Sequence, residues 1–466
     1  MRGGTDYLKK LRKGEPLSLR QLSMMTIRLS IPAIMAQIST IVMQYIDASM
    51  VGTLGAAGSA SIGLVSSTTW LCGGIAMAIG MGFSVQCAQK IGAGQMDEAR
   101  NLVQTGMLVT LLFSILIGGI GMGIARFLPV WLRGDPAIRK DASSYFFIYA
   151  LFFAVERINF LGGSFLQASG NMRTPGILHV MMCVLDVIFN AILIFPGMTL
   201  WGVIRIPGLG LGVAGAALGT GLAKLCSMVL MLYFLYRKSP VLRMWERERL
   251  RIRRDHIRKS IRIALPIAVE NVIMNSAQIA STRIVAPLGT VAVAANSLSI
   301  TAESLCYMPG FGISAAATAI IGQSIGARRK DLTRRIGWLI TGLGVAVMTL
   351  NGILLYVFAP FMIAFLSPVP EVIALGTRVL RIEAFAEPLY AASIISTGVM
   401  RGGGDTLGPA ALSLICMWAI RIPLALFLSP RMGLAGVWTA MCIELCIRGV
   451  LFLARQAQGK YAKNAG

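Results

Sequence analysis

The chain alternates between long apolar runs and short polar or basic connections. Runs of 18 or more apolar residues, such as Ile27–Val51 and Gly433–Ala454, can each cross a hydrocarbon core about 30 Å thick as a helix of roughly 20 residues. Backbone polar groups inside a bilayer must be satisfied within each segment, so these runs are predicted to be helices. Twelve are predicted, at 27–51, 60–87, 101–124, 142–165, 176–197, 209–236, 263–287, 293–320, 337–360, 373–398, 409–428 and 433–454. The predicted fold class is an all-α integral membrane protein with twelve transmembrane helices.

The two halves of the chain repeat one pattern, 234 residues apart. The repeated residues are Pro32 and Pro266, Gly55 and Gly289, Gly92 and Gly326, Ala93 and Ala327, and Gly170 and Gly404. Each half holds an even number of helices, so both halves start on one side, related by a pseudo-two-fold axis along the membrane normal. The predicted parts are a segment 1–26, a six-helix lobe 27–236, a basic linker 237–262, a second six-helix lobe 263–455 and a tail 456–466.

The positions of the positive charges along the chain predict its orientation in the membrane, and they argue against a nucleic-acid partner. The net charge is +23, but only 14% of the residues are charged and 56% are hydrophobic. The Lys and Arg residues gather near the N-terminus, in Arg237–Arg262 and in Arg328–Arg335. Such clusters mark the cytoplasmic side and contact lipid headgroups. We therefore expect a protein of the plasma (inner) membrane with both termini in the cytoplasm.

No pattern in the chain predicts an enzyme or a bound cofactor. The eight cysteines all lie in apolar runs, and no CxxC pair or zinc-like spacing is present. The glycine-rich run Arg401–Asp405 lacks the Lys and Ser/Thr of a phosphate-binding loop, and no predicted strand precedes it. A non-transporting membrane receptor or enzyme is therefore the least favoured class.

A few polar residues inside the apolar runs are candidates for an ion site, because charged groups within a bilayer are costly and usually functional. Asp47 lies in the first run with Gln44 on the same helical face. Asp186 and Asn190 lie four residues apart in the fifth run, and the repeat has no acid in place of either aspartate. Two such carboxylates can take up protons, or bind Na⁺ with help from Gln44, Asn190 and Thr220. A purely structural role for each aspartate stays open.

Further intramembrane polar residues are candidates for the lining of a substrate cavity, where acidic side chains would attract organic cations. These are Glu156, Asn159, Glu270, Glu303, Glu383 and Glu387. Arg157 is adjacent to Glu156, so an internal ion pair is an equal alternative there. A helix kink is expected at Pro388, next to Glu387. Glu444 and Arg448, four residues apart, are predicted to form a structural pair.

Together these residues resemble the multidrug and toxic compound extrusion family, the MATE transporters. The resemblance covers about 27–455 and rests on ordered markers rather than on a single one. The markers are Pro32, Asp47 with MVGTLG, then QKIGAGQMDEAR, LQASGNMRTP, IIGQSIGARR and MRGGGDT. The resemblance implies a two-lobed bundle that exports organic cations in exchange for H⁺ or Na⁺, with Asp47 as the family's aspartate of the first helix.

The chain departs from the family pattern in the fifth run. The family commonly has Asn-x-x-x-Asp there, whereas this chain has Asp186 followed by Asn190. Where some relatives carry an acid in the tenth run, this chain has Tyr390, which joins the predicted substrate cavity.

We expect a monomeric antiporter for small cationic or amphipathic substrates that works by alternating access. The alternative is a lipid-linked saccharide flippase, whose cavity should be lined with Arg and Lys. Intramembrane cations are few: Arg157, Lys224, Arg283 and Arg421.

Overall fold

The structure is a computed structural model that describes residues 3–13, 15–132, 134–200, 204–243 and 253–465. Contacts divide the chain into two compact units. Unit 1 comprises Met1–Ile38, Ala88–Gln95 and Val269–Gly466, and unit 2 comprises Ser39–Cys87 and Met96–Ala268. Three long helices contribute residues to both units: α2 (Leu19–Gly52), α3 (Ala56–Gly92) and α9 (Arg254–Val285).

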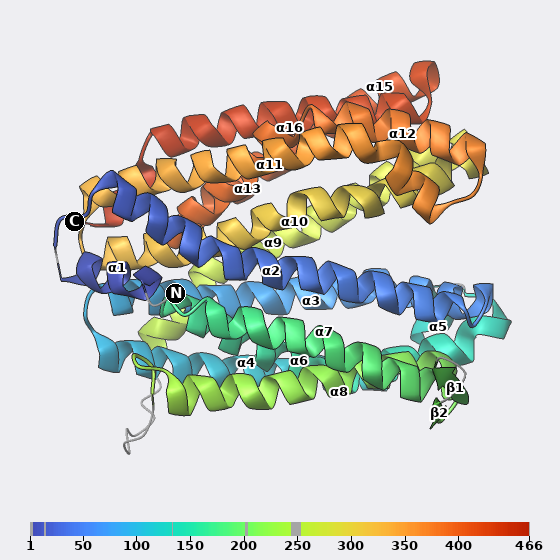
Figure 1. Ribbon diagram of the computed structural model, residues 1–466, viewed down its shortest axis with the longest axis horizontal. Coiled ribbons are helices and arrows are strands. Elements are labelled where there is room, and N and C mark those ends of the chain that lie inside the picture. The colour runs from blue at the N-terminus through green and yellow to red at the C-terminus, as the bar shows by residue number, and fades with distance from the viewer. Residues whose placement is uncertain (1–2, 14, 133, 201–203, 244–252, 466) are drawn as a thin grey trace. The chain divides into compact units, whose positions relative to one another are not determined.

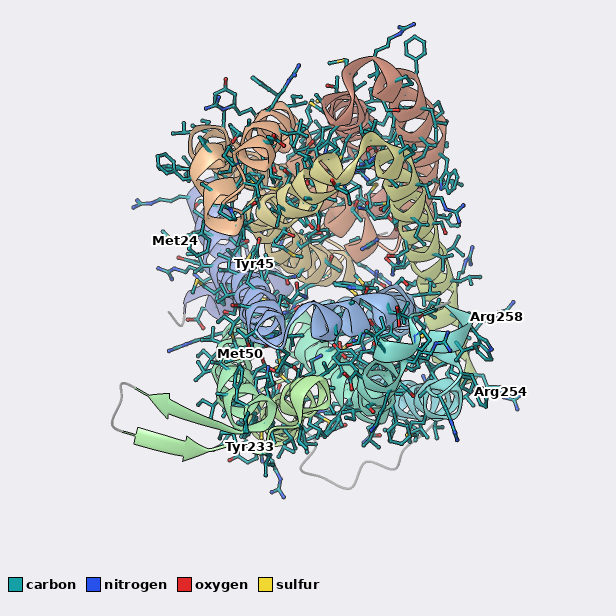
Figure 2. The ribbon with its side chains drawn as sticks, turned by 90° about the vertical axis from the view of Figure 1, so that its right-hand side faces the viewer. Met24, Tyr45, Met50, Tyr233, Arg254 and Arg258 are labelled. Carbon is teal, nitrogen blue, oxygen red and sulfur yellow. The ribbon has the colours of Figure 1, made fainter. Side chains whose placement is uncertain are left out.

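Unit 2 is a bundle of long helices with one short hairpin (Figure 1). Besides its parts of α2, α3 and α9, it contains α4 (Met96–Ile124), α5 (Leu128–Trp131), α6 (Pro136–Ala168), α7 (Arg173–Ile194), β1 (Gly197–Leu200), β2 (Ile204–Pro207), α8 (Gly212–Tyr233) and the π-helix η1 (Phe234–Lys238). α8 packs against both α6 and α7, and α6 also packs against α4. β1 and β2 pair antiparallel and stand clear of the helices α7 and α8 that they connect (Figure 2).

Unit 1 holds the remaining helices. They are α1 (Gly3–Arg12), the 3₁₀ turn η2 (Ala286–Leu288), α10 (Thr290–Gly326), α11 (Lys330–Leu366), α12 (Pro370–Ala384), α13 (Glu387–Gly402), α14 (Leu407–Ile415), the π-helix η3 (Cys416–Arg421), α15 (Ile422–Met432), α16 (Leu434–Ala457) and η4 (Lys460–Ala465). α10 packs against α11, α12 and α13, and α16 packs against α12, α13 and α15. α1 packs on α10 with Leu8 and Leu11 fully buried.

The twelve predicted spans are confirmed, with one of them broken. Within the described part of the chain, eleven helices are long and apolar enough to cross a membrane. The twelfth span, predicted at 373–398, consists of α12 and α13, which are separated by Phe385 and Ala386. The break lies just before Pro388, as expected for a residue that has no N–H and clashes with the preceding turn.

Several helices are longer than their apolar runs. α2 begins at Leu19, eight residues before the predicted start at 27, and α9 begins at Arg254 instead of 263. The last part of the predicted linker 237–262 is therefore helical, and residues 244–252 of it lie outside the described residues. Hydropathy reports the length that crosses the bilayer, whereas the helix continues through its polar ends. The division into lobes at 27–236 and 263–455 stays a prediction.

The backbone repeats with the same period as the sequence. Gly55 and Gly289 have φ of 97° and 99°, and Gly170 and Gly404 have φ of 91° and 82°. Each of these pairs is 234 residues apart, and each glycine follows the end of a helix, where a left-handed residue is favoured. Gly170 and Gly404 thus form equivalent tight turns in the two halves of the chain.

Two repeated glycines permit one close helix contact in unit 1. A Cβ on Gly92 would lie 2.0 Å from the carbonyl oxygen of Gln323, and one on Gly326 would lie 1.8 Å from that of Gln89. Gln89 and Gln323 are themselves repeat partners. The ends of α3 and α10 therefore meet symmetrically, backbone to backbone, at a distance that only glycine allows.

Candidate ion-coupling site

Asp47, Asp186 and Asn190 form one hydrogen-bonded group in unit 2. Asn190 Nδ2 donates to Asp47 Oδ1 at 2.8 Å and to Asp186 Oδ2 at 3.1 Å. Asp186 and Asn190 are one turn apart on α7, so they present both groups to Asp47 on α2. One amide thus bridges the two carboxylates, and a proton shared between them would remove one of their two charges.

The group lies between two apolar clusters in unit 2. On one side are Met43, Met182, Cys183 and Ala223, and on the other are Val51, Ile194 and Ala216. Met43 and Val51 are each four residues from Asp47, and Met182 and Ile194 are one turn before Asp186 and one turn after Asn190. Helices α2 and α7 thus supply the polar group, and α2, α7 and α8 together supply the apolar clusters that flank it.

Burial makes this group costly in its fully charged form. Asp186 and Asn190 have no exposed surface, while Asp47 is half-buried. Asp186 Oδ1 and Asn190 Oδ1 have no hydrogen-bond partner among the described residues. A buried oxygen without a partner costs about 1–3 kcal/mol. A proton or a cation that bonds to these oxygens would recover that free energy.

Gly219 on α8 sets the position of Asn190. A Cβ at residue 219 would lie 2.1 Å from Asn190 Oδ1 and 3.0 Å from Asn190 N. No side chain larger than hydrogen fits between α8 and the amide. The close approach of α7 and α8 therefore holds the Asn190 side chain toward the two carboxylates.

Gln44 and Thr220, predicted as further ion ligands, are not bonded to this group. Gln44 is exposed and Thr220 is half-buried. Thr220 lies on α8 between Ala216 and Ala223, each of which belongs to an apolar cluster that flanks the group. Its hydroxyl is thus placed near the group, and its role as a ligand stays a prediction.

Glu156 on α6 is held by two cations. Arg157 pairs with Glu156 Oε1, and Lys224 Nζ on α8 lies 3.2 Å from Glu156 Oε2. Arg157 Nη1 also donates to the carbonyl oxygen of Gly73 on α3 at 2.9 Å. The ion pair that the sequence offered as one alternative for Glu156 is present, and a cavity role stays a prediction.

Sequence reasoning did not assign Lys224 or Tyr145 to the site, although both interact electrostatically with it. Lys224 interacts electrostatically with Asp47 as well as with Glu156, so it connects the two groups. Tyr145 on α6 interacts electrostatically with Asp47, Glu156 and Asp186. Lys224 is one turn after Thr220 and Tyr145 is three turns before Glu156, so the helical periodicity was a usable signal.

Asn159 is engaged by its own neighbours in unit 2. Its Oδ1 accepts from Ser227 Oγ at 3.2 Å, and its Nδ2 lies 3.8 Å from Met182 Sδ. Because Met182 belongs to one of the apolar clusters beside Asp186, Asn159 supports the packing around the site.

The predicted acids of unit 1 divide into a paired one and a buried cluster. Glu270 on α9 accepts from Arg401 Nη2 at 2.8 Å and from Ser413 Oγ at 3.1 Å. Glu303, Glu383 and Glu387 meet at the α12–α13 break against α10, where they interact electrostatically. All three are buried.

Tyr390 lies in the same part of unit 1, next to the pair of Glu444 and Arg448 on α16. Tyr390 stacks edge-on against Tyr307, with ring centroids 5.7 Å apart, and lies under the Arg448 guanidinium at 5.5 Å. Arg448 Nε lies 3.2 Å from Glu444 Oε1, so the structural pair predicted on α16 is confirmed. The cavity roles of Glu270, Glu303, Glu387 and Tyr390 stay predictions.

The repeat is matched by one family model, MatE, which fits residues 32–192 and again residues 266–427. The chain belongs to the MatE family. Members of this family are membrane transporters, so this MatE chain is an integral membrane transporter and not an enzyme. The two matched regions begin at Pro32 and Pro266, the first residues of the repeat.

Similar proteins and structures span almost the whole chain. A probable multidrug resistance protein NorM from Thermotoga maritima is 26% identical, with 94% of this chain and 93% of that protein covered. The multidrug resistance protein MdtK of Yersinia pestis is 23% identical, with 92% and 93% covered. A crystal structure of a mutant of the Vibrio cholerae MATE transporter VcmN matches with a TM-score of 0.88 at 18% identity, covering 96% of this chain and 98% of that one. The structural match confirms the two-lobed, twelve-helix fold class.

Proposed function

We propose that this MatE protein is a secondary antiporter of the inner membrane that exports small cationic or amphipathic drugs in exchange for H⁺ or Na⁺. The observation that carries the proposal is the group in which Asn190 bridges Asp47 and Asp186 in the interior of unit 2. The names of the relatives NorM and MdtK, both multidrug resistance proteins, support the drug-export part.

The coupling step follows from the charges of the site. When a proton is bound, the two carboxyl groups share a hydrogen bond and α2 and α7 are held together. When the proton leaves, two like charges remain in a largely apolar surrounding, and their repulsion favours separation of the two helices. Na⁺ bound by carboxylate and amide oxygens would neutralise the same charges. The bound cation thus controls how α2 packs on α7, and the substrate is held or released accordingly.

Intramembrane cations of unit 2 do not favour the flippase alternative. A flippase for anionic lipid-linked saccharides needs Arg or Lys side chains that are free to bind phosphate. Arg157 and Lys224 are both engaged by Glu156. Lys224 also interacts with Asp47, so both cations are engaged by carboxylates of unit 2 and neither is free to bind phosphate.

The test is efflux of a cationic dye from proteoliposomes under an imposed gradient. The purified protein is reconstituted, the dye is loaded, and an inward gradient of either H⁺ or Na⁺ is applied with the other ion held equal. The proposal expects one gradient to drive efflux several-fold faster than no gradient. Equal efflux under all three conditions would rule out cation-coupled export.

A further inference from the structure

A groove of about 750 Å³ lies in unit 1 between the first turns of α2, the first turns of α11 and the end of α16. This volume falls within the range of about 300–1,000 Å³ that is typical of small-molecule sites. None of its residues belongs to the ion-coupling group. The groove has a charged end and an apolar wall, and each part constrains what it can bind.

The charged end consists of Arg334 and Arg335 on α11. Both side chains are exposed. The Arg334 guanidinium packs on the turn that follows α16, because a Cβ on Gly459 would lie 2.2 Å from Arg334 Nη2. Each guanidinium group provides a planar fork of donors that suits phosphate oxygens.

The apolar wall continues along the helices away from these arginines. On α11 it includes Trp338, which is 45% exposed, and Leu343, and on α2 it includes Leu19 and Ile27, which are 62% and 39% exposed. Gly342 lies in the wall with no atom within 4 Å of its Cβ position, so the space above it is open. Gly342 and Leu343 are two turns beyond Arg334 and Arg335, or about 12 Å along the helix.

Thr26 on α2 adds a polar group inside the groove. Its side chain is 1% exposed and lines the groove, and its hydroxyl has no hydrogen-bond partner in the described part of the chain. An unpaired buried hydroxyl costs about 1–3 kcal/mol. A ligand with an oxygen at this depth, between its charged head and its apolar part, would satisfy it.

We propose that this groove binds one anionic phospholipid. Its phosphate would lie at Arg334 and Arg335, its ester oxygens would reach Thr26, and one acyl chain would follow the wall past Trp338 and over Gly342. Basic pockets between transmembrane helices bind anionic headgroups by this combination of charge and apolar surface. The site lies at the end of unit 1 where basic residues gather, which is where a lipid headgroup would be.

Charge argues against a cationic drug as the occupant. Two guanidinium groups at the mouth repel organic cations, which are the substrates in the proposed function. The lipid site therefore does not depend on that proposal, and it can be tested without transport.

The experiment measures lipid retention by native mass spectrometry of the purified, delipidated protein. Phosphatidylglycerol, phosphatidylcholine and inorganic phosphate are added in parallel. We expect phosphatidylglycerol to be retained at least about ten-fold more than phosphatidylcholine, which corresponds to about 1.4 kcal/mol. Arg334→Gln with Arg335→Gln should abolish this preference, and Gly342→Trp should weaken retention although it changes no charge.

Two matched control variants distinguish the lipid site from general effects of removing charge or adding a large side chain. Arg258→Gln with Lys259→Gln removes two adjacent exposed cations from α9, and Gly119→Trp fills a second glycine whose Cβ position has no atom within 4 Å. Both control variants should bind the lipid like the wild type. Equal retention of the two lipids would overturn the proposal, as would equal losses in the control variants. The proposal would also be overturned if inorganic phosphate competed as well as the lipid. It would be overturned too if a second copy of the chain occupied the groove, which would appear as a wild-type dimer that Gly342→Trp converts to monomer.

Discussion

At the scale of single residues, the site depends on one amide placed between two acids. Asn190 contacts both carboxylates, so its position joins α2 to α7. Sequence could place Asp186 and Asn190 on one face from their spacing of four. It could not show that this face is turned toward Asp47, or that Lys224 pairs with Glu156 and also interacts electrostatically with Asp47. These facts depend on how α2, α7 and α8 are rotated against one another, which apolar periodicity leaves open when helices are apolar on nearly every side.

The order of acid and amide on α7 can be tested by exchange. Asp186→Asn alone removes a carboxylate, and we expect efflux to fall at least about ten-fold, or about 1.4 kcal/mol of barrier. The double variant Asp186→Asn with Asn190→Asp again has one carboxylate and one amide on α7. Its carboxylate at position 190 faces Asp47 directly, so partial efflux should return. Dye efflux from proteoliposomes checks both variants. A double variant no better than the single one would mean that the position of the charge is decisive, and full activity of the single variant would make Asp186 structural.

Gly219 offers an indirect test of the same group. Gly219→Ala places a methyl group against Asn190 Oδ1 and the α7 backbone, so the amide must move. We expect efflux several-fold below wild type with both carboxylates intact. Gly52→Ala, where a Cβ would meet no atom within 4 Å, is the matched control and should transport normally. Normal efflux by Gly219→Ala would show that the placement of Asn190 is not critical.

At the scale of elements, the repeat predicts which turns are strained. Gly94 and Arg328 are 234 residues apart, follow α3 and α10, and have φ of 74° and 57°. Both turns have the same pair of backbone hydrogen bonds, from Gly94 N and Gln95 N in one and from Arg328 N and Arg329 N in the other. Arg328 therefore occupies a left-handed position that its repeat partner fills with glycine.

Reciprocal substitutions measure this strain. Arg328→Gly should raise the stability by about 1 kcal/mol, because glycine avoids the steric cost of the left-handed conformation, and Gly94→Arg should lower it by about 1–2 kcal/mol. Melting temperatures of the purified protein in detergent give the sign of each change. The control is Arg329→Gly, at φ −99°, which should give no gain. A lower melting temperature for Arg328→Gly would contradict the argument.

Residue types explain which features of the helices the sequence predicted well and which it did not. The repeat singled out Gly55, Gly170 and their partners, and all four lie in turns because only glycine adopts those angles easily. Pro388 marked the break between α12 and α13. The starts of α2 and α9 were placed too late because their first turns are polar, and a polar helix end has no hydropathy signal. The meeting of Glu303 with Glu383 and Glu387 could not be foreseen from spacing, because it joins three different helices.

At the scale of the whole molecule, the distribution of basic residues predicts the orientation in the membrane. Arg254 and Arg258 point outward from the first turns of α9, in the region predicted to be cytoplasmic (Figure 2). In a variant without its native cysteines, Arg254→Cys should be protected from an impermeant thiol reagent in intact cells. Lys140→Cys should react, because Lys140 is exposed in the first turns of α6, which the same orientation places on the external side. The opposite pattern would invert the orientation.

We propose that the group of Asp47, Asn190 and Asp186 couples cation entry to drug export. The most direct measurement is dye efflux by Asp47→Asn in proteoliposomes under whichever gradient, H⁺ or Na⁺, drives the wild type. Asparagine keeps the size of the side chain but can neither bind a proton nor offer a charge to Na⁺. Gradient-driven efflux should fall at least about ten-fold, while membrane insertion and the melting temperature should stay close to those of the wild type. Efflux at the wild-type rate, driven by the same gradient, would contradict it.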